Sequence, residues 1–206
     1  MNRFLKRAWA EIDLDALEHN YNEIKKLAKG KDILAVVKAN AYGHDDKAVC
    51  LKLQELGVKY YGVSNLWEGE KLRCHGITGT ILTFGYTDED YFDELLEYGI
   101  TQTAGSVQYA KQLSDYAVSK GVKLPVHIKV NTGMTRVGID SQQEMLDILA
   151  MPGLDCKAAY THFAAADSLD PSDVEYTDRQ QEKLMKIAKD KGLLIHSQNS
   201  GGIIYH

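Results

Sequence analysis

Six side chains that could carry chemistry share one kind of place in the sequence: each comes at or shortly after the end of a short apolar or β-branched run. They are Lys38, Lys129, Arg136, His162, Asn199 and Ser200. In a barrel of parallel strands, catalytic groups gather at the carboxyl ends of the strands. If the runs are strands, the six positions predict one shared site.

Lys38 is the most informative of the six. It ends the nearly all-apolar run Ile33–Lys38 and precedes the segment Ala39–His44. A continuous apolar run is typical of a strand buried on both faces. Charge on an amine at the end of such a strand is costly, so the neutral amine is favoured and can attack an aldehyde. The alternative is a lysine that reaches solvent at the strand mouth.

The other positions also allow ordinary interpretations. The segment TGMTRVG, which contains Arg136, could be a turn with surface charges, as Gly133 and Gly138 indicate. His162 could be a hydrogen-bonded core histidine. The polar segment Ser197–Gly202 could present backbone N–H groups to a phosphate just before a helix, or be a plain loop.

Strand-like runs alternate with longer amphipathic segments along the whole chain. The predicted strands are Trp9–Leu14, Ile33–Lys38, Tyr60–Ser64, Thr80–Phe84, Ile100–Thr103, Val126–Val130, Cys156–Thr161 and Leu193–Ser197. The predicted helices are Ala16–Lys29 with Asp15 as its N-cap, Asp46–Leu56, Trp67–Cys74, Glu89–Tyr98, Val107–Lys120, Gln142–Ala150 and Asp173–Lys191, with a further helix beginning near the last residue, His206. Strict alternation predicts a parallel sheet with helices outside it.

Two architectures fit this alternation, an open doubly wound sheet and a (β/α)8 barrel. No GxGxxG motif follows an early strand, and seven β–α steps run without a break in composition, which favours the barrel. A complete barrel needs eight strands and typically about 250 residues. We therefore expect these 206 residues to be one unit short.

Composition narrows the class of protein. Hydrophobic residues make up 44% and charged residues 26%, ordinary values for a globular protein, and the net charge of −5 without a basic stripe argues against nucleic-acid binding. The cysteines Cys50, Cys74 and Cys156 form no disulfide framework, and neither they nor the seven histidines have the spacing of metal ligands. The N-terminus lacks the apolar core of a signal peptide, and no run approaches the ~20 apolar residues of a membrane span, so a cytoplasmic protein is expected.

Five segments give the sequence a family resemblance. RAWAEIDLDALEHNY, AVVKANAYGH, HIKVNTGMTRVGI, THFAAAD and HSQNSGGI follow one another between Arg7 and Ile203. Together they resemble the N-terminal region of alanine racemases, pyridoxal-phosphate enzymes with an (α/β)8 barrel and a C-terminal β domain. The resemblance implies an incomplete barrel, with about seven β–α units and without the eighth strand and the C-terminal domain. Residues 1–14 would contain a strand that pairs with that missing domain, and residues 15–206 would be the cofactor-binding barrel.

The resemblance also implies roles for residues of this chain. Lys38 would hold pyridoxal phosphate covalently and act as one of two bases that move the substrate Cα proton, and Arg136 would approach the cofactor and the substrate carboxylate. The expected cofactor contacts are Tyr42, His162, Asn199, Ser200 and Gly201, with His162 orienting an arginine that faces the pyridine nitrogen. Lys129 matches a lysine that is often carbamylated and held near Arg136. Asp45 stands where the family usually has glycine, close to the phosphate side.

The expected reaction is the interconversion of L- and D-alanine by a homodimer with a shared active site. The second base, a tyrosine from the other subunit's C-terminal domain, is outside this sequence, so this chain alone should be a poor racemase or none. Three alternatives remain open. They are a racemase for serine or another amino acid, a non-catalytic pyridoxal-phosphate-binding module of cofactor homeostasis, and a metal-assisted aldolase with the same barrel.

Overall fold

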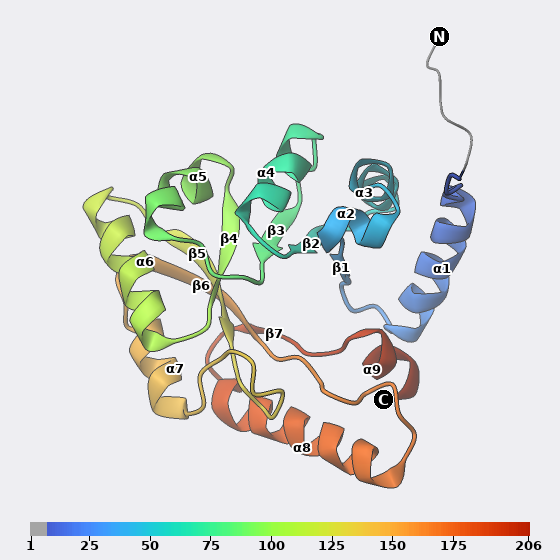
Figure 1. Ribbon diagram of the computed structural model, residues 1–206. Coiled ribbons are helices and arrows are strands. Elements are labelled where there is room, and N and C mark those ends of the chain that lie inside the picture. The colour runs from blue at the N-terminus through green and yellow to red at the C-terminus, as the bar shows by residue number, and fades with distance from the viewer. Residues whose placement is uncertain (1–7) are drawn as a thin grey trace.

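Seven parallel strands form a single curved sheet in the computed structural model, which describes residues 8–206. The strands are β1 (Leu34–Val36), β2 (Tyr60–Val63), β3 (Thr80–Thr83), β4 (Ile100–Ala104), β5 (Leu124–Lys129), β6 (Leu154–Tyr160) and β7 (Leu194–His196). Each strand pairs in parallel with the next one along the chain, from β1 to β7. The order is that of a (β/α) barrel (Figure 1), which confirms the barrel and excludes the doubly wound alternative, whose strand order reverses.

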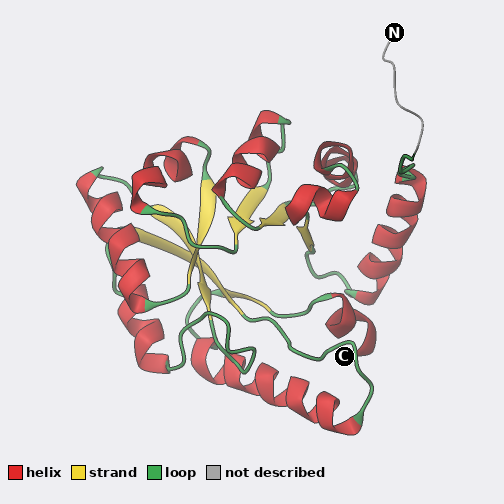
Figure 2. Ribbon diagram, viewed as in Figure 1, coloured by secondary structure: helices red, strands yellow, loops and turns green. Residues whose placement is uncertain are grey.

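Helices cover the outside of this sheet, as Figure 2 shows. They are α1 (Leu14–Leu27), α2 (Lys38–Gly43), α3 (Asp46–Glu55), α4 (Leu66–Cys74), α5 (Phe92–Glu97), α6 (Val107–Ser119), α7 (Gln142–Leu149), α8 (Pro171–Ala188) and α9 (Ser200–Tyr205), with a 3₁₀ turn η1 at Glu89–Tyr91. Short polar side chains fix the starts of several helices. Ser141 and Glu144 form a capping box at α7, and Asp170 caps α8 just before Pro171.

The inner strands are buried on both faces. All five residues of β4 are buried, and Tyr61, Ile81 and Ile128 are completely buried in the cluster that joins the sheet to its helices. Burial on both faces explains why these strands read as continuous apolar runs rather than as alternating ones.

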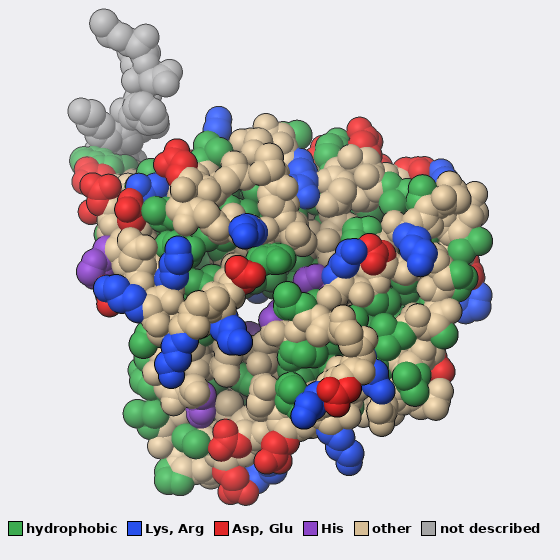
Figure 3. Space-filling view, turned by 180° about the vertical axis from the view of Figure 1, so that it is seen from behind, with side chains coloured by type: hydrophobic (Ala, Val, Ile, Leu, Met, Phe, Trp, Pro, Cys, Tyr) green, Lys and Arg blue, Asp and Glu red, His purple; other side chains and the backbone are tan. Residues whose placement is uncertain are grey.

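The outer strands differ from this pattern. Within residues 8–206, β1 pairs only with β2 and β7 only with β6, so the sheet is a half-barrel open between them. Val36 and Leu194 are 42% and 49% exposed. The prediction of a first strand buried on both faces was therefore wrong, because β1 lies at an edge. Between the edges lies a cavity of about 540 Å³ lined by residues of all seven strands, and Figure 3 shows a hollow with histidine side chains at its rim.

Several predicted boundaries need correction. Trp9–Asp13 is not in a strand and Leu14 is the first residue of α1, because Asp13, not Asp15, caps this helix by accepting hydrogen bonds from the N–H groups of Asp15 and Ala16. Residues 1–7 of the predicted N-terminal segment lie outside the described residues. The pairing of this segment with a second domain stays a prediction.

No helix among residues 8–206 combines the length and the apolar character that crossing a membrane requires.

Candidate active site

The predicted site residues lie at the carboxyl ends of four strands. Lys38 follows β1, Lys129 is the last residue of β5, and His162 comes two residues after β6. Asn199 and Ser200 lie beyond β7, at the start of α9. Residues that are up to about 160 positions apart in sequence therefore lie together at the carboxyl-terminal end of the half-barrel, because all its strands run in parallel.

Lys38 begins a turn of unusual backbone conformation. The four residues after it, Ala39 to Tyr42, have φ between 51° and 56° and ψ between 36° and 49°, the left-handed helical region. None of the four is glycine, and such a conformation costs about 1–2 kcal/mol for each residue. The turn carries Lys38, which is half-buried, and Tyr42, whose ring centroid is 6.0 Å from the Lys38 Nζ. Non-glycine residues kept in this region are typical of functional sites.

Lys129 is buried inside the half-barrel. Its Nζ donates a hydrogen bond of 3.0 Å to the Val130 carbonyl, lies 3.5 Å from the Thr161 hydroxyl and faces the Tyr160 ring at 5.4 Å. Burial, together with the charge of Arg136, lowers the pKa of Lys129 to about 8. About a tenth of this amine is therefore neutral and nucleophilic at pH 7, far more than at an ordinary lysine.

Arg136 is exposed in the loop after β5, and the loop is held by local hydrogen bonds. The Asn131 side-chain oxygen accepts from the N–H groups of Gly133 and Thr135, and Gly133 and Gly138 have φ of 142° and 135°. At Gly138 a Cβ would lie 2.5 Å from the Asn131 nitrogen, so only glycine fits there. The loop is a turn, as the ordinary interpretation held, and it also brings the Arg136 charge to bear on Lys129.

His162 joins the same cluster. It is half-buried, and its pKa is lowered by burial first and then by the charges of Arg136, Lys129 and Lys38. Its backbone carbonyl accepts from the buried side chain of Gln180, which also accepts from the Ala164 N–H group. Because the charges of Arg136, Lys129 and Lys38 all act on His162, these four basic side chains lie in one region.

Asn199 and its neighbours form the start of α9. The Asn199 side-chain oxygen accepts from the Gly202 N–H at 2.9 Å and so caps the helix. Gly201 lies against the segment after β6, because a Cβ there would be 2.8 Å from the backbone of Ala166. The segment is therefore a helix cap packed on the THFAAAD loop, with Ser200 exposed.

Asp45, which stands where the resemblance led us to expect glycine, caps α3. Its carboxylate accepts from the Ala48 N–H at 2.9 Å.

Three residues at the centre of the half-barrel were missed by the sequence analysis: the buried His127 and Tyr160 and the half-buried His196. His127 Nδ1 lies 3.1 Å from His196 Nε2, and the ring of Tyr160 stacks on that of His196 with centroids 4.7 Å apart. Burial lowers the pKa of His127 to about 4 and that of His196 to about 3. One signal pointed to this pair: His127 lies two residues before Lys129 on β5, so both side chains face the same side of the sheet.

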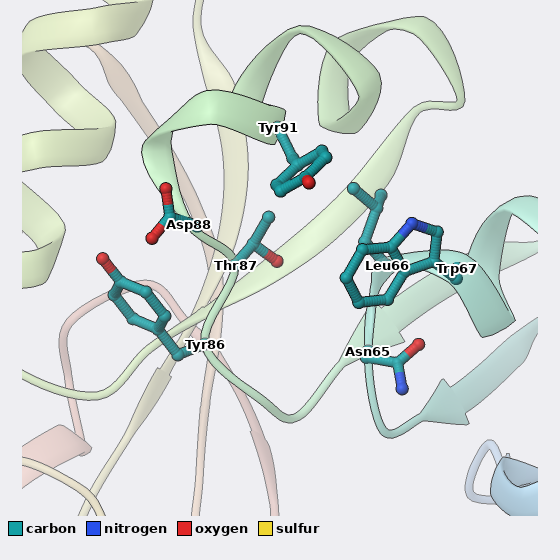
Figure 4. A pocket seen from close by; sticks show the side chains of 7 residues that line it. All are labelled: Asn65, Leu66, Trp67, Tyr86, Thr87, Asp88 and Tyr91. Carbon is teal, nitrogen blue, oxygen red and sulfur yellow. The ribbon is translucent and has the colours of Figure 1, made fainter.

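A second hollow lies near the carboxyl ends of β2 and β3. It has a volume of about 190 Å³ and is walled by aromatic side chains from the start of α4 and the loop after β3 (Figure 4). Trp67 and Tyr91 meet edge to face with centroids 5.5 Å apart. None of the predicted site residues lines this pocket. Among residues 8–206, no three His, Cys, Asp or Glu side chains are grouped so that they could hold a metal ion.

Comparisons with known proteins agree with this geometry. The family model described as alanine racemase, N-terminal domain, matches residues 12–206. An alanine racemase of Clostridium perfringens is 39% identical over 214 aligned positions, which cover 99% of this chain and 55% of that protein. The solved alanine racemase of Clostridium difficile 630 has a TM-score of 0.89 and 34% identity and covers 98% of this chain and 55% of its own.

A histidine racemase of Leuconostoc mesenteroides has a TM-score of 0.84 and 28% identity, over 93% of this chain and 53% of its own. The chain thus spans a little over half the length of these relatives. With one barrel order, one cluster of basic side chains and a family match from residue 12 to residue 206, the chain belongs to the alanine racemase family and carries its N-terminal domain.

Proposed function

We propose that this chain is the cofactor-binding barrel of a pyridoxal-phosphate-dependent racemase that interconverts L- and D-alanine. The proposal rests on one observation. In a chain of this family, Lys38, Lys129, Arg136 and His162 lie in one region at the carboxyl-terminal end of the half-barrel. The names of the relatives support alanine as the substrate.

The donor set suits pyridoxal phosphate. The primary amine of Lys38 is the group that an aldehyde requires, and the surrounding positive charges are complementary to a phosphate ester. We propose that Tyr42, Asn199, Ser200 and Gly201 contact the cofactor at its phosphate side. Asp45 does not oppose this assignment, because its carboxylate is engaged as the cap of α3.

When bound, the cofactor would withdraw electrons from the substrate Cα and so make its proton removable. Inversion at that carbon requires a proton acceptor on one face and a proton donor on the other. We assign the Lys38 Nζ to one face, where it takes the proton. The opposite face would be served by a residue outside these 206, contributed by the second subunit of a homodimer.

Lys129 and Arg136 would act as a pair. The neutral amine of Lys129 can attack carbon dioxide, so that an N–C bond forms, a proton is released and the lysine becomes a carbamate anion. This anion would lie near Arg136, whose charge already acts on the Lys129 amine. Arg136 would then be held in place to receive the substrate carboxylate. His162 would orient an arginine at the cofactor ring.

The decisive experiment locates the cofactor on this chain. The purified protein is incubated with pyridoxal phosphate and reduced with borohydride, and the modified peptide is identified by mass spectrometry. A pyridoxyl group on Lys38 is expected, and its loss in Lys38→Ala is the control. A folded protein that gives no adduct at Lys38 would contradict the proposal for this chain.

A second candidate function concerns the substrate. A histidine racemase has a similar barrel, so a fold of this kind also serves an enzyme named for a larger amino acid. Racemisation of alanine, serine and histidine by the full-length protein, followed by chiral chromatography, distinguishes the three, and alanine is expected to react fastest.

A further inference from the structure

We infer that Glu68, in the first turn of α4, is a positioning residue that aims Lys38 by holding the left-handed turn beside it. The inference rests on the function proposed for Lys38. Nothing in the sequence pattern of the site assigns Glu68 a role, and it comes 30 residues later in the chain.

The Glu68 carboxylate bridges two neighbouring strand ends. Its Oε1 accepts a hydrogen bond of 2.8 Å from the Ala39 N–H, directly after Lys38. Its Oε2 accepts one of 2.7 Å from the Ser64 N–H, directly after β2. The carboxylate thus ties the exit of β1 to the exit of β2.

The position of Glu68 in α4 makes this bridge unusual. A glutamate in the third position of a helix commonly turns back to the N–H of the N-cap residue. Here the N-cap Asn65 accepts from the Glu68 N–H at 3.1 Å, while the Glu68 side chain reaches past the cap to Ser64 and across to Ala39. The negative charge also lies at the positive end of the helix dipole, which is a favourable electrostatic position.

The bridge meets the turn where its unusual conformation starts. Ala39 is the first of the four consecutive left-handed residues, with φ 52° and ψ 49°. The next residue is held by the same helix, because Asn40 Oδ1 lies 3.4 Å from the Lys71 Nζ and accepts from the Asp46 N–H at 3.2 Å. Lys71 in turn pairs with the buried carboxylate of Asp46 at 2.8 Å.

Release of the Ala39 N–H would free the peptide between Lys38 and Ala39 to rotate toward the ordinary right-handed region. That rotation redirects the Lys38 side chain without removing any residue of the core. The expected effect is therefore a less reactive Lys38 in a protein that still folds.

The test compares Glu68→Gln with Glu70→Gln. Glu70 lies on the same helix and accepts from the Tyr98 hydroxyl at 3.2 Å, so the control loses an equivalent charge without touching the turn. After treatment with pyridoxal phosphate and borohydride, the ratio of pyridoxyl on Lys38 to pyridoxyl on the exposed Lys47 is measured in one sample. The ratio should fall about tenfold in Glu68→Gln and stay unchanged in Glu70→Gln.

A cofactor-free measurement separates this inference from the proposed function. Amide hydrogen exchange at residues 39–42 should be faster in Glu68→Gln than in the control. If the original chain forms no adduct at Lys38, the proposed function fails, and the exchange rates alone judge whether Glu68 holds the turn.

Two results would overturn the inference. One is an unchanged ratio and unchanged exchange in Glu68→Gln. The other is loss of the whole fold in both Glu68→Gln and Glu68→Asp, because Glu68 would then serve the fold in general rather than the direction of Lys38.

Discussion

Burial of a charged lysine destabilises the folded state. Lys129 is buried only when the chain is folded, so its charge lowers the free energy of unfolding. Burial holds its pKa at about 8, against an ordinary value of 10.5. In the unfolded chain the amine keeps its proton up to the higher value. Between about pH 8 and pH 10.5 the unfolded state therefore binds more protons, and this residue's contribution to stability rises with pH.

Replacement of Lys129 by methionine should relieve this cost. In buffer free of carbon dioxide, where Lys129 stays an amine, Lys129→Met at pH 7 is expected to raise the free energy of unfolding by about 3 kcal/mol, and the gain should vanish as the pH approaches 10.5. Urea unfolding at several pH values measures it, with the exposed Lys47→Met as the control. A gain independent of pH would mean that packing, and not charge, explains the effect.

The histidine pair His127 and His196 should make stability depend on pH in the acid range. His127 and His196 stay neutral in the folded state down to about pH 4 and 3, whereas unfolded histidines take up protons near 6.5. Stability should therefore fall as the pH drops below 6.5, by about 2 kcal/mol for each histidine at pH 5. His127→Gln should flatten this dependence in urea titrations at pH 7 and pH 5. The exposed His19→Gln should keep the original slope.

At the scale of elements, Arg73 joins α4 to the starts of β3 and β4. Its guanidinium donates hydrogen bonds of 2.7–3.1 Å to the backbone carbonyls of Ile77, Gly79, Tyr98 and Gly99. Arginine presents these donors in a fixed planar arrangement that lysine lacks.

Loss of Arg73 should loosen both strand entries. Arg73→Met is expected to lower the free energy of unfolding by about 2–4 kcal/mol, because several carbonyls lose a charged donor. Thermal or urea unfolding checks this, and Arg179→Met, which removes an exposed pair with Glu175 and a surface contact with the Tyr176 ring, should change little. Equal effects in the two variants would refute the role of Arg73.

The elements show what the sequence could and could not predict. Apolar runs and glycine stops located all seven strands of the sheet. Burial on both faces requires apolar residues at successive positions, which makes β2 to β6 visible in the sequence. The first helix begins two residues earlier than an N-cap at Asp15 suggested, because Asp13 accepts from the N–H groups of Asp15 and Ala16. The left-handed turn was not predictable, since no residue from Ala39 to Tyr42 is a glycine. Its cause is the distant Glu68.

At the scale of the whole molecule, we expect the open edges of β1 and β7 to determine how the chain associates. Unpaired strand edges are ready to bind other strands. We expect the chain to self-associate through these edges as its concentration rises. Size-exclusion chromatography with light scattering should show this, and the edge variants Val36→Lys and Leu194→Lys should shift the chain toward monomer. Val118→Lys, which alters an exposed residue of α6, should not. Monomer at every concentration in the original chain would contradict the expectation.

The left-handed turn after β1 also orders events in time. The local hydrogen bonds of residues 39–42, such as that from the Ala41 N–H to the Val37 carbonyl at 2.9 Å, accompany a conformation that is costly at each residue, and the contact that holds Ala39 comes from a residue 29 positions away. A contact of that kind cannot form until β2 and the first turn of α4 are in place. The segment around Lys38 should therefore belong to the late steps of folding, and an isolated peptide of residues 34–44 should not populate the turn. Lys38 acquires its direction only after the scaffold around it exists.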